Sequence, residues 1–233
     1  PNATVCDTAT LTVTASAAPK LTVTKTATPA VLVVGATGQS YTITIAVANG
    51  PTTAAITIAD TLPAGITTSG AITATGGTIS GCPAAGATSL AGCSIAAGAA
   101  TGNIVITVPV SVAAATANPS TNTATATGGG DPLCTGTAPA CSGTTTNPVI
   151  DAVDETVTKQ PGITSSTDVS TNDKFPAGSS FTQTATTCTP AGTMTTAGVA
   201  SYTTPAANSS CTVTYQVCAP APNATVCDTA VLT

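Results

Sequence analysis

Apolar residues alternate with threonine along much of this chain, and few folds accept that pattern. It is clearest in the segments LTVTKT, SYTITIAVANG and NIVITVPVSV, which begin at Leu21, Ser40 and Asn103. Because successive side chains of a strand point to opposite faces, each segment has one apolar and one threonine face. Gly, Pro and Asn separate the segments, and the Ala-rich stretches are too interrupted to form a helix. The sequence therefore predicts an all-β protein of tandem Ig-like antiparallel β-sandwiches.

One stretch occurs twice. The chain begins PNATVCDTATLT at Pro1 and closes PNATVCDTAVLT at Pro222, and the two copies differ only at Thr10 and Val231. Such a chain resembles one period of a longer array, or a subunit whose tail resembles its neighbour's head. The strand-like alternation of the first copy gives it one apolar face, formed by Val5, Ala9, Leu11 and Val13. A lone strand cannot bury that face, so we expect it to complete a neighbouring repeat.

Three segments follow from this pattern. Residues 1–15 are expected to be the closing strand of the preceding repeat's Ig-like domain. Residues 20–147 are expected to form the first β-sandwich, and residues 148–233 a second Ig-like β-sandwich. The runs CTVTYQV and TVCDTAVLT near the C-terminus predict a hairpin around the turn APAPN. The closing strand of the second sandwich is therefore the C-terminal copy of the duplicated stretch.

Composition excludes several function classes. Charged residues make up 6% of the chain, the net charge is −5 and there is no His. Nucleic-acid binding requires clustered Lys and Arg, so it is not expected. The commonest general base and metal ligand is missing, so we expect no enzyme and no cofactor. No run of 18 or more apolar residues occurs, so direct membrane insertion is not expected.

The chain has nine Cys. Cys6 and Cys227 occupy the same position in the two copies, so one period holds an even number, as disulfides formed in an oxidising compartment require. We expect the pairs Cys82–Cys93, Cys134–Cys141, Cys188–Cys211 and Cys218–Cys227, with Cys6 paired to the Cys218 equivalent of the preceding repeat. Sequence does not prove this connectivity, and free or zinc-bound thiols are the alternative, although no CxxC motif or His supports a zinc site.

Four runs in the first sandwich resemble a known family. They are Lys25-Thr-Ala-Thr-Pro, Val33-Val-Gly through to Asn49, Asp60-Thr-Leu-Pro-Ala-Gly-Ile and Asn122-Thr-Ala-Thr-Ala-Thr. Over residues 20–130 they resemble the conserved surface-protein repeat domain, which is related to the isopeptide-forming fimbrial domain. The second sandwich is similar to bacterial Ig-like or cadherin-like adhesin repeats, through Ser170-Thr-Asn-Asp, Pro176-Ala-Gly and the closing hairpin. Both resemblances imply secreted, multi-domain bacterial surface proteins.

Three polar residues of the first sandwich share the inward phase of their strands: Lys25, Asp60 and Asn122. Buried charges are costly unless paired, so these groups should meet. A neutral Lys25 amine could then attack the Asn122 carboxamide while protonated Asp60 polarises its carbonyl. The resemblance implies the same chemistry, with a Lys on the first strand and an Asn on the last. In the alternative, Lys25 reaches the sandwich edge and Asp60 caps a turn.

Acidic residues gather where the second sandwich begins: Asp151, Asp154 and Glu155, with Asp173 further along. Hard cations favour carboxylate oxygens, so a Ca²⁺ ion that stiffens the junction is one interpretation. A solvated acidic linker is the other.

Together these features favour a structural repeat or subunit of an extracellular bacterial filament, sheath or cell-surface stalk. Its partners would be copies of itself, either joined in one long polypeptide or assembled by strand exchange. The alternative is an adhesin module that binds a glycan or a host surface. Aromatic residues make up only 2% of the chain, which weakens that alternative.

Overall fold

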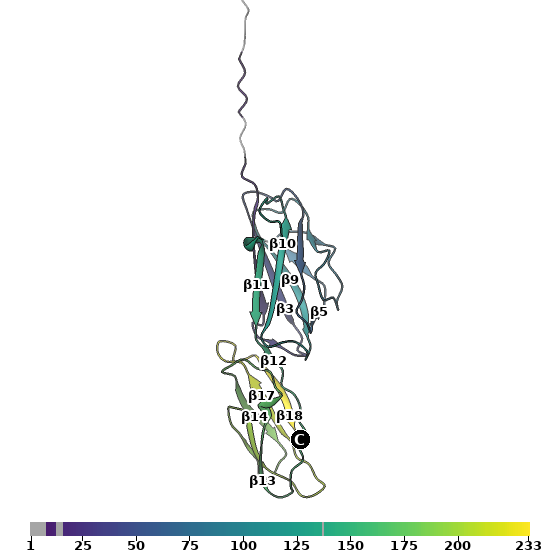
Figure 1. The fold of residues 1–233 in the computed structure, drawn as a ribbon, viewed down its shortest axis with the longest axis vertical. Coiled ribbons are helices and arrows are strands. Elements are labelled where there is room, and N and C mark those ends of the chain that lie inside the picture. Colours follow the sequence, from purple (N-terminus) through teal and green to yellow (C-terminus); the bar gives the residue numbers. More distant parts are fainter. Residues whose placement is uncertain (1–7, 13–15, 137) are drawn as a thin grey trace, which may run out of the picture.

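The computed structural model describes residues 8–12, 16–136 and 138–233. Within these ranges the chain is all-β, and the helical pieces are two short 3₁₀ turns, η1 (Pro139–Cys141) and η2 (Val169–Thr171). No helix in these ranges is long and apolar enough to cross a membrane. Two β-sheet bodies lie end to end along the long axis (Figure 1). The expected all-β class is therefore confirmed.

The first body is a sandwich of two five-stranded antiparallel sheets. One sheet has the order β1–β3–β9–β5, with β6 also paired to β9: β1 (Lys20–Thr28), β3 (Gln39–Ala48), β9 (Gly102–Val112), β5 (Ile66–Thr68) and β6 (Thr73–Thr75). The other has the order β11–β10–β4–β8–β7: β11 (Ser142–Asn147), β10 (Ser120–Gly128), β4 (Ile56–Asp60), β8 (Ser94–Ile95) and β7 (Ile79–Ser80).

The alternating sequence pattern explains this body. Along β1 every second residue is buried, beginning with Leu21 and Val23, while the threonines between them are exposed. The same alternation runs through β3 and β9, which pair along most of their length. Ile, Val and Leu from both sheets fill the space between them, together with Tyr41. A core of branched aliphatic side chains is what a threonine-rich, aromatic-poor sequence can build.

The second body has two three-stranded sheets. One has the order β13–β16–β15: β13 (Thr164–Asp168), β16 (Val199–Thr203) and β15 (Thr193–Met194). The other has the order β14–β17–β18: β14 (Ser180–Thr186), β17 (Val213–Cys218) and β18 (Cys227–Leu232). Strands β17 and β18 form the hairpin expected from the sequence, with Val213 opposite Leu232 and Cys218 opposite Cys227.

A short parallel pair of strands connects the two bodies. Strand β2 (Leu32–Val33) pairs with β12 (Val149–Ile150), and the Leu32 amide donates to the Pro148 carbonyl at 2.9 Å. Leu32 and Val149 belong to the first core, whereas Val33 and Ile150 belong to the second. The sequence placed the whole VLVV run in the first sandwich, but β2 contributes to both cores.

Polar contacts reinforce this junction. The Asn118 side chain accepts from the Val149 amide at 3.0 Å and donates to the Phe175 carbonyl at 3.0 Å. The Lys174 ammonium donates to the carbonyls of Ala114 and Thr116 in the first body. It also pairs with the Asp151 carboxylate of its own body, at 3.3 Å. The two bodies are therefore joined by backbone pairing, apolar packing and side-chain hydrogen bonds.

Candidate functional site

Lys25, Asp60 and Asn122 meet inside the first sandwich. Lys25 comes from β1 in one sheet, and the other two come from β4 and β10 in the facing sheet. The backbones of β4 and β10 pair Asp60 with Ala124, two residues from Asn122 on the same face. The exposed fractions of the three residues are 5% for Lys25, 3% for Asp60 and 1% for Asn122.

Burial excludes the simpler interpretation of Lys25. Its side chain has no exposed surface, so it does not reach the edge of the sandwich. The ammonium instead donates to Asp60 Oδ2 and lies 4.6 Å from the centre of the Tyr41 ring. The alternative in which Lys25 and Asp60 serve separate edge and turn roles is therefore wrong.

Several polar atoms of this site have no partner. Among the described residues, Asp60 Oδ1 and both polar atoms of the Asn122 carboxamide make no hydrogen bond. A buried, unpaired polar group costs about 1–3 kcal/mol. The unpaired carboxamide of Asn122 therefore lowers the stability of the first body. Such a costly residue indicates a role beyond packing.

Burial moves the two charged groups toward their neutral forms. It lowers the pKa of the Lys25 amine, and the Asp60 charge only partly opposes this. It likewise raises the pKa of the Asp60 carboxyl, and the opposing influence of the Lys25 charge only partly offsets this. A neutral amine is a nucleophile and a neutral carboxyl is a hydrogen-bond donor, so the site favours the two species that amide formation needs.

Four disulfides close loops outside this site. They join Cys82 to Cys93, Cys134 to Cys141, Cys188 to Cys211 and Cys218 to Cys227. These are the pairs expected from the sequence, and they leave no thiol among the described cysteines for zinc. Disulfides persist in oxidising environments, so four of them are typical of an extracellular or secreted protein. Cys6 lies outside the described residues.

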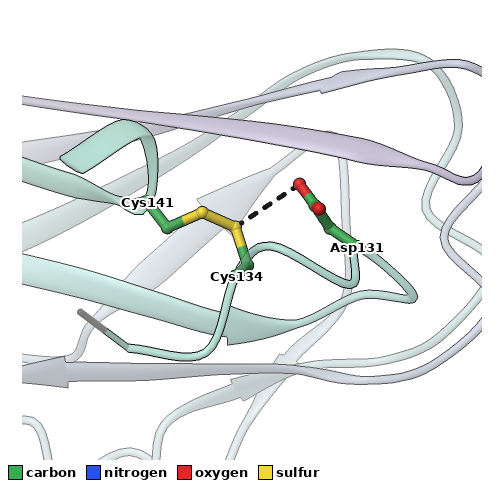
Figure 2. Close-up of side chains that lie close together, drawn as sticks. All are labelled: Asp131, Cys134 and Cys141. Carbon is green, nitrogen blue, oxygen red and sulfur yellow. Dashed lines mark hydrogen bonds between the residues drawn. A yellow bond between two sulfur atoms is a disulfide. The ribbon is translucent and has the colours of Figure 1, made fainter. Parts of the chain in front are cut away.

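Asp131 is a buried acid that sequence reasoning missed. Figure 2 shows its carboxylate beside the Cys134–Cys141 disulfide, with Oδ2 at 3.5 Å from Cys134 Sγ. The same oxygen accepts from the Leu21 amide at 2.8 Å, and Oδ1 accepts from the Leu133 amide at 2.9 Å. Asp131 therefore ties the start of β1 to the disulfide loop. The DPLC sequence carried a signal, because an Asp that bonds the amide two residues on is a common turn motif.

Asp131, Cys134 and Cys141 lie close enough together to resemble a metal centre. The two sulfurs are bonded to each other, and only a thiolate is an effective metal ligand. Both carboxylate oxygens already accept backbone amides. With Cys134 and Cys141 joined as a disulfide, this group stabilises the loop and is not a metal site.

The acidic residues of the junction do not converge on one point. Asp151 pairs with Lys174, and Asp154 accepts from the Val231 amide at 2.8 Å. Among the described residues, Glu155 and these two acids do not lie close enough together to form a group of potential metal ligands. Asp173 accepts from the Val153 amide at 2.7 Å. The interpretation of this segment as a Ca²⁺ site is therefore not supported: the carboxylates of Asp151, Asp154 and Asp173 bind groups of the protein itself, and among the described residues these acids form no cluster of potential ligands.

The expected strand-exchange residues divide into two groups. Val5 and Val13 lie outside the described residues. Ala9 and Leu11 are exposed and belong to no strand, although the sequence predicted a strand over residues 1–15. The exposed fraction of Leu11 is 86%, whereas that of its counterpart Leu232 in β18 is 2%. Residues 8–12 therefore form no strand within this single chain. Their expected pairing with a neighbouring repeat stays a prediction, because it concerns a second copy.

Comparisons with known proteins add little. Models of protein families give no match to this chain, and the search of curated proteins finds no similar sequence. Among solved structures, the chain is similar to the protocadherin gamma B2 extracellular cadherin domains 3–6, with 11% identity and a TM-score of 0.28. The match covers 92% of this chain and 49% of the protocadherin chain, so this chain spans about half the length of that protein. At this similarity the match identifies neither a family nor a function.

Proposed function

We propose that this chain is a structural repeat of an extracellular bacterial filament, sheath or surface stalk, in which copies follow one another end to end. The carrying observation is the duplicated stretch. Its C-terminal copy forms β18 and is buried at Leu232, whereas the described part of its N-terminal copy is exposed. An identical apolar pattern that is buried at one end and exposed at the other favours a segment that completes a neighbour.

A continuous array accounts for the duplication better than separate subunits. The C-terminal copy already occupies its place beside β17 and is held there by the Cys218–Cys227 disulfide. A strand donated by another subunit would have to displace it. In a continuous array, the same stretch ends one period and begins the next, so no strand is redundant.

The size of the native polypeptide tests this arrangement. We expect electrophoresis under reducing and denaturing conditions to show chains many times larger than the 22.0 kDa of this segment. A single reduced band at 22.0 kDa would instead show separate subunits. Electron microscopy of the same material should show a fibre with a regular repeat.

Within each period, Lys25, Asp60 and Asn122 are proposed to form an intramolecular cross-link. Asp60 first takes a proton from the Lys25 ammonium. The neutral amine then attacks Asn122 Cγ while the Asp60 carboxyl donates to the carboxamide oxygen. The new C–N bond replaces the bond to the amide nitrogen, which leaves as ammonia with its two hydrogens and one from the amine. The burial of all three residues and the unpaired carboxamide support this step.

The aromatic residues support a structural role over an adhesive or enzymatic one. Tyr41, Tyr215 and Phe181 are buried. The ring of Phe175 packs edge-on against that of Phe181, with 5.0 Å between the ring centres. Recognition surfaces usually present aromatic side chains to the partner. Here these rings fill the two cores instead.

A further inference from the structure

A cavity opens in the second body beside the end of β18. Its volume is about 470 Å³, and much of its lining is apolar or sulfur-containing: Val157, Cys188, Tyr202, Cys211, Val213 and Leu232. The Cys188–Cys211 disulfide and the last residues of β18 border the same space. A small apolar side chain that entered from the end of β18 would therefore be buried here.

The backbone beside this cavity presents an unfinished ladder. The Thr233 amide donates to the Glu155 carbonyl at 2.8 Å, and the Val157 amide donates to the Thr233 carbonyl at 2.8 Å. This is the pattern of two parallel strands. Within the described ranges, the Val157 carbonyl and the Lys159 amide make no such bonds. They are the groups that a residue two positions beyond Thr233 would reach.

The duplicated stretch specifies what would come next. Leu11 and Thr12 correspond to Leu232 and Thr233, and Val13 and Thr14 follow them in the sequence. Strand alternation places a residue directly after Thr233 on the same face as buried Leu232. The β17–β18 register, extended by two residues, sets that position opposite Cys211.

We propose that Val13–Ala15 of the following copy continue β18 and complete this body. The Val13 side chain enters the cavity beside the Cys188–Cys211 disulfide. The Thr14 amide donates to the Val157 carbonyl, and the Lys159 amide donates to the Thr14 carbonyl. This inference rests on the proposed end-to-end arrangement, and it names the contact that one copy makes with the next.

The contact also restricts the spacing between copies. Pro19 is buried against the first body, and the three residues before it, Ser16, Ala17 and Ala18, are exposed. If Val13–Ala15 are held by the preceding copy, only these three residues connect the two bodies. Consecutive copies would then be joined by a short linker.

Short extensions of the full chain test the contact without a filament. One variant adds Val-Thr-Ala after Thr233, and its matched control adds Asp-Thr-Ala. We expect the first to raise the melting temperature of the second body by roughly 5 °C, because it buries one Val side chain. Amide exchange at Lys159 should slow about tenfold, because that group gains a partner. The control should change neither quantity.

Equal melting temperatures and equal Lys159 exchange in the two extended chains would overturn the proposal. These outcomes are independent of the native chain length. A single 22.0 kDa native subunit would refute the continuous array yet leave the stabilisation by Val-Thr-Ala unaffected.

Discussion

Leu32 and Val33 are neighbours on one two-residue strand, and their side chains are buried in two different hydrophobic cores. Adjacent residues of a strand point to opposite faces, so a short strand between two bodies can contribute to both. The parallel partner strand repeats the arrangement with Val149 and Ile150. The junction is therefore part of both cores rather than a flexible linker.

Substitution of these neighbours should destabilise different bodies. Leu32→Ala is expected to lower the free energy of unfolding of the first body by about 2–5 kcal/mol, and Val33→Ala that of the second by roughly 1–3 kcal/mol. Hydrogen exchange measured by mass spectrometry, resolved by segment, would show which body opens more often. If both variants loosened the same body, the division of the cores at β2 would be wrong.

The cross-link can be read from the mass of the intact chain. After the four disulfides are allowed for, the chain should be lighter than its sequence by one ammonia. The variants Lys25→Met and Asn122→Ala remove the nucleophile or the carboxamide, and Asp60→Asn removes the proton carrier. All three should restore the full mass.

The same measurement separates two outcomes that the geometry suggests. The Lys25 ammonium contacts Asp60 directly. A loss of water in place of ammonia would mean that the amide forms with Asp60, and Asn122 would then not be the acceptor. An unchanged mass would rule out any cross-link and leave a buried ion pair.

The Cys218–Cys227 disulfide should contribute substantially to the second body. It closes a loop with a sequence separation of 9. Replacement of both residues by Ser is expected to cost about 2–3 kcal/mol, because the unfolded chain regains the freedom that the loop removed. The matched pair Cys82→Ser and Cys93→Ser should weaken the first body and leave the second unchanged. Chemical denaturation monitored separately in each body would test this. Loss of stability in both bodies from either pair of substitutions would contradict the prediction.

The second body should become more stable as the pH is lowered below 6. Burial raises the pKa of Asp173 from an ordinary value of 3.8 to about 6, although hydrogen bonds from Val153 and Tyr215 oppose the shift. The folded protein therefore binds this proton more readily than the unfolded chain. The stabilisation is complete below pH 3.8 and is lost as the pH rises through 6.

Thermal melts between pH 4 and pH 7 would measure this dependence, with Asp173→Asn as the control. The amide retains an acceptor for the Val153 amide and the Tyr215 hydroxyl but does not titrate. The melting temperature of this variant should therefore vary less with pH across that range. A slope identical to that of the unmodified chain would assign the dependence to another group.

Lys174 should restrict motion between the two bodies. Lys174→Met keeps much of the side-chain volume but removes the contacts with Ala114, Thr116 and Asp151. Small-angle scattering is expected to show a broader distribution of interdomain orientations for this variant. The control is Lys159→Met, because Lys159 is exposed and has no ion pair within the described ranges. Identical scattering from the two variants would mean that packing alone fixes the junction.

Local pattern was enough to predict the fold class and the convergence of the three polar residues. Strand alternation is a local property, so the phase of Lys25 beside Leu21 and Val23 could be read from LTVTKT alone. The closing hairpin was equally readable, because its turn and the matched phases of Cys218 and Cys227 lie within a short segment.

The junction could not be read in this way. The VLVV run is apolar throughout and has no period from which to assign a face, so nothing local separates Leu32 from Val33. The contacts of Lys174 with carbonyls of the first body join segments far apart in the sequence. Such contacts depend on how the two bodies are placed.

The course of the chain through the first sandwich determines how it would respond to being pulled. Strand β1 leads into the end where β2 and β12 pair, and β11 leads to the same end before the chain enters the second body (Figure 1). Tension along the long axis would therefore pull the start of β1 and the end of β11 in opposite directions. The strands would be sheared along their length, so many hydrogen bonds would have to break together rather than peel apart one at a time. The proposed bond between Lys25 of β1 and Asn122 of β10 would join the two sheets covalently. It would therefore limit how far these strands could slide apart and how far the body could extend.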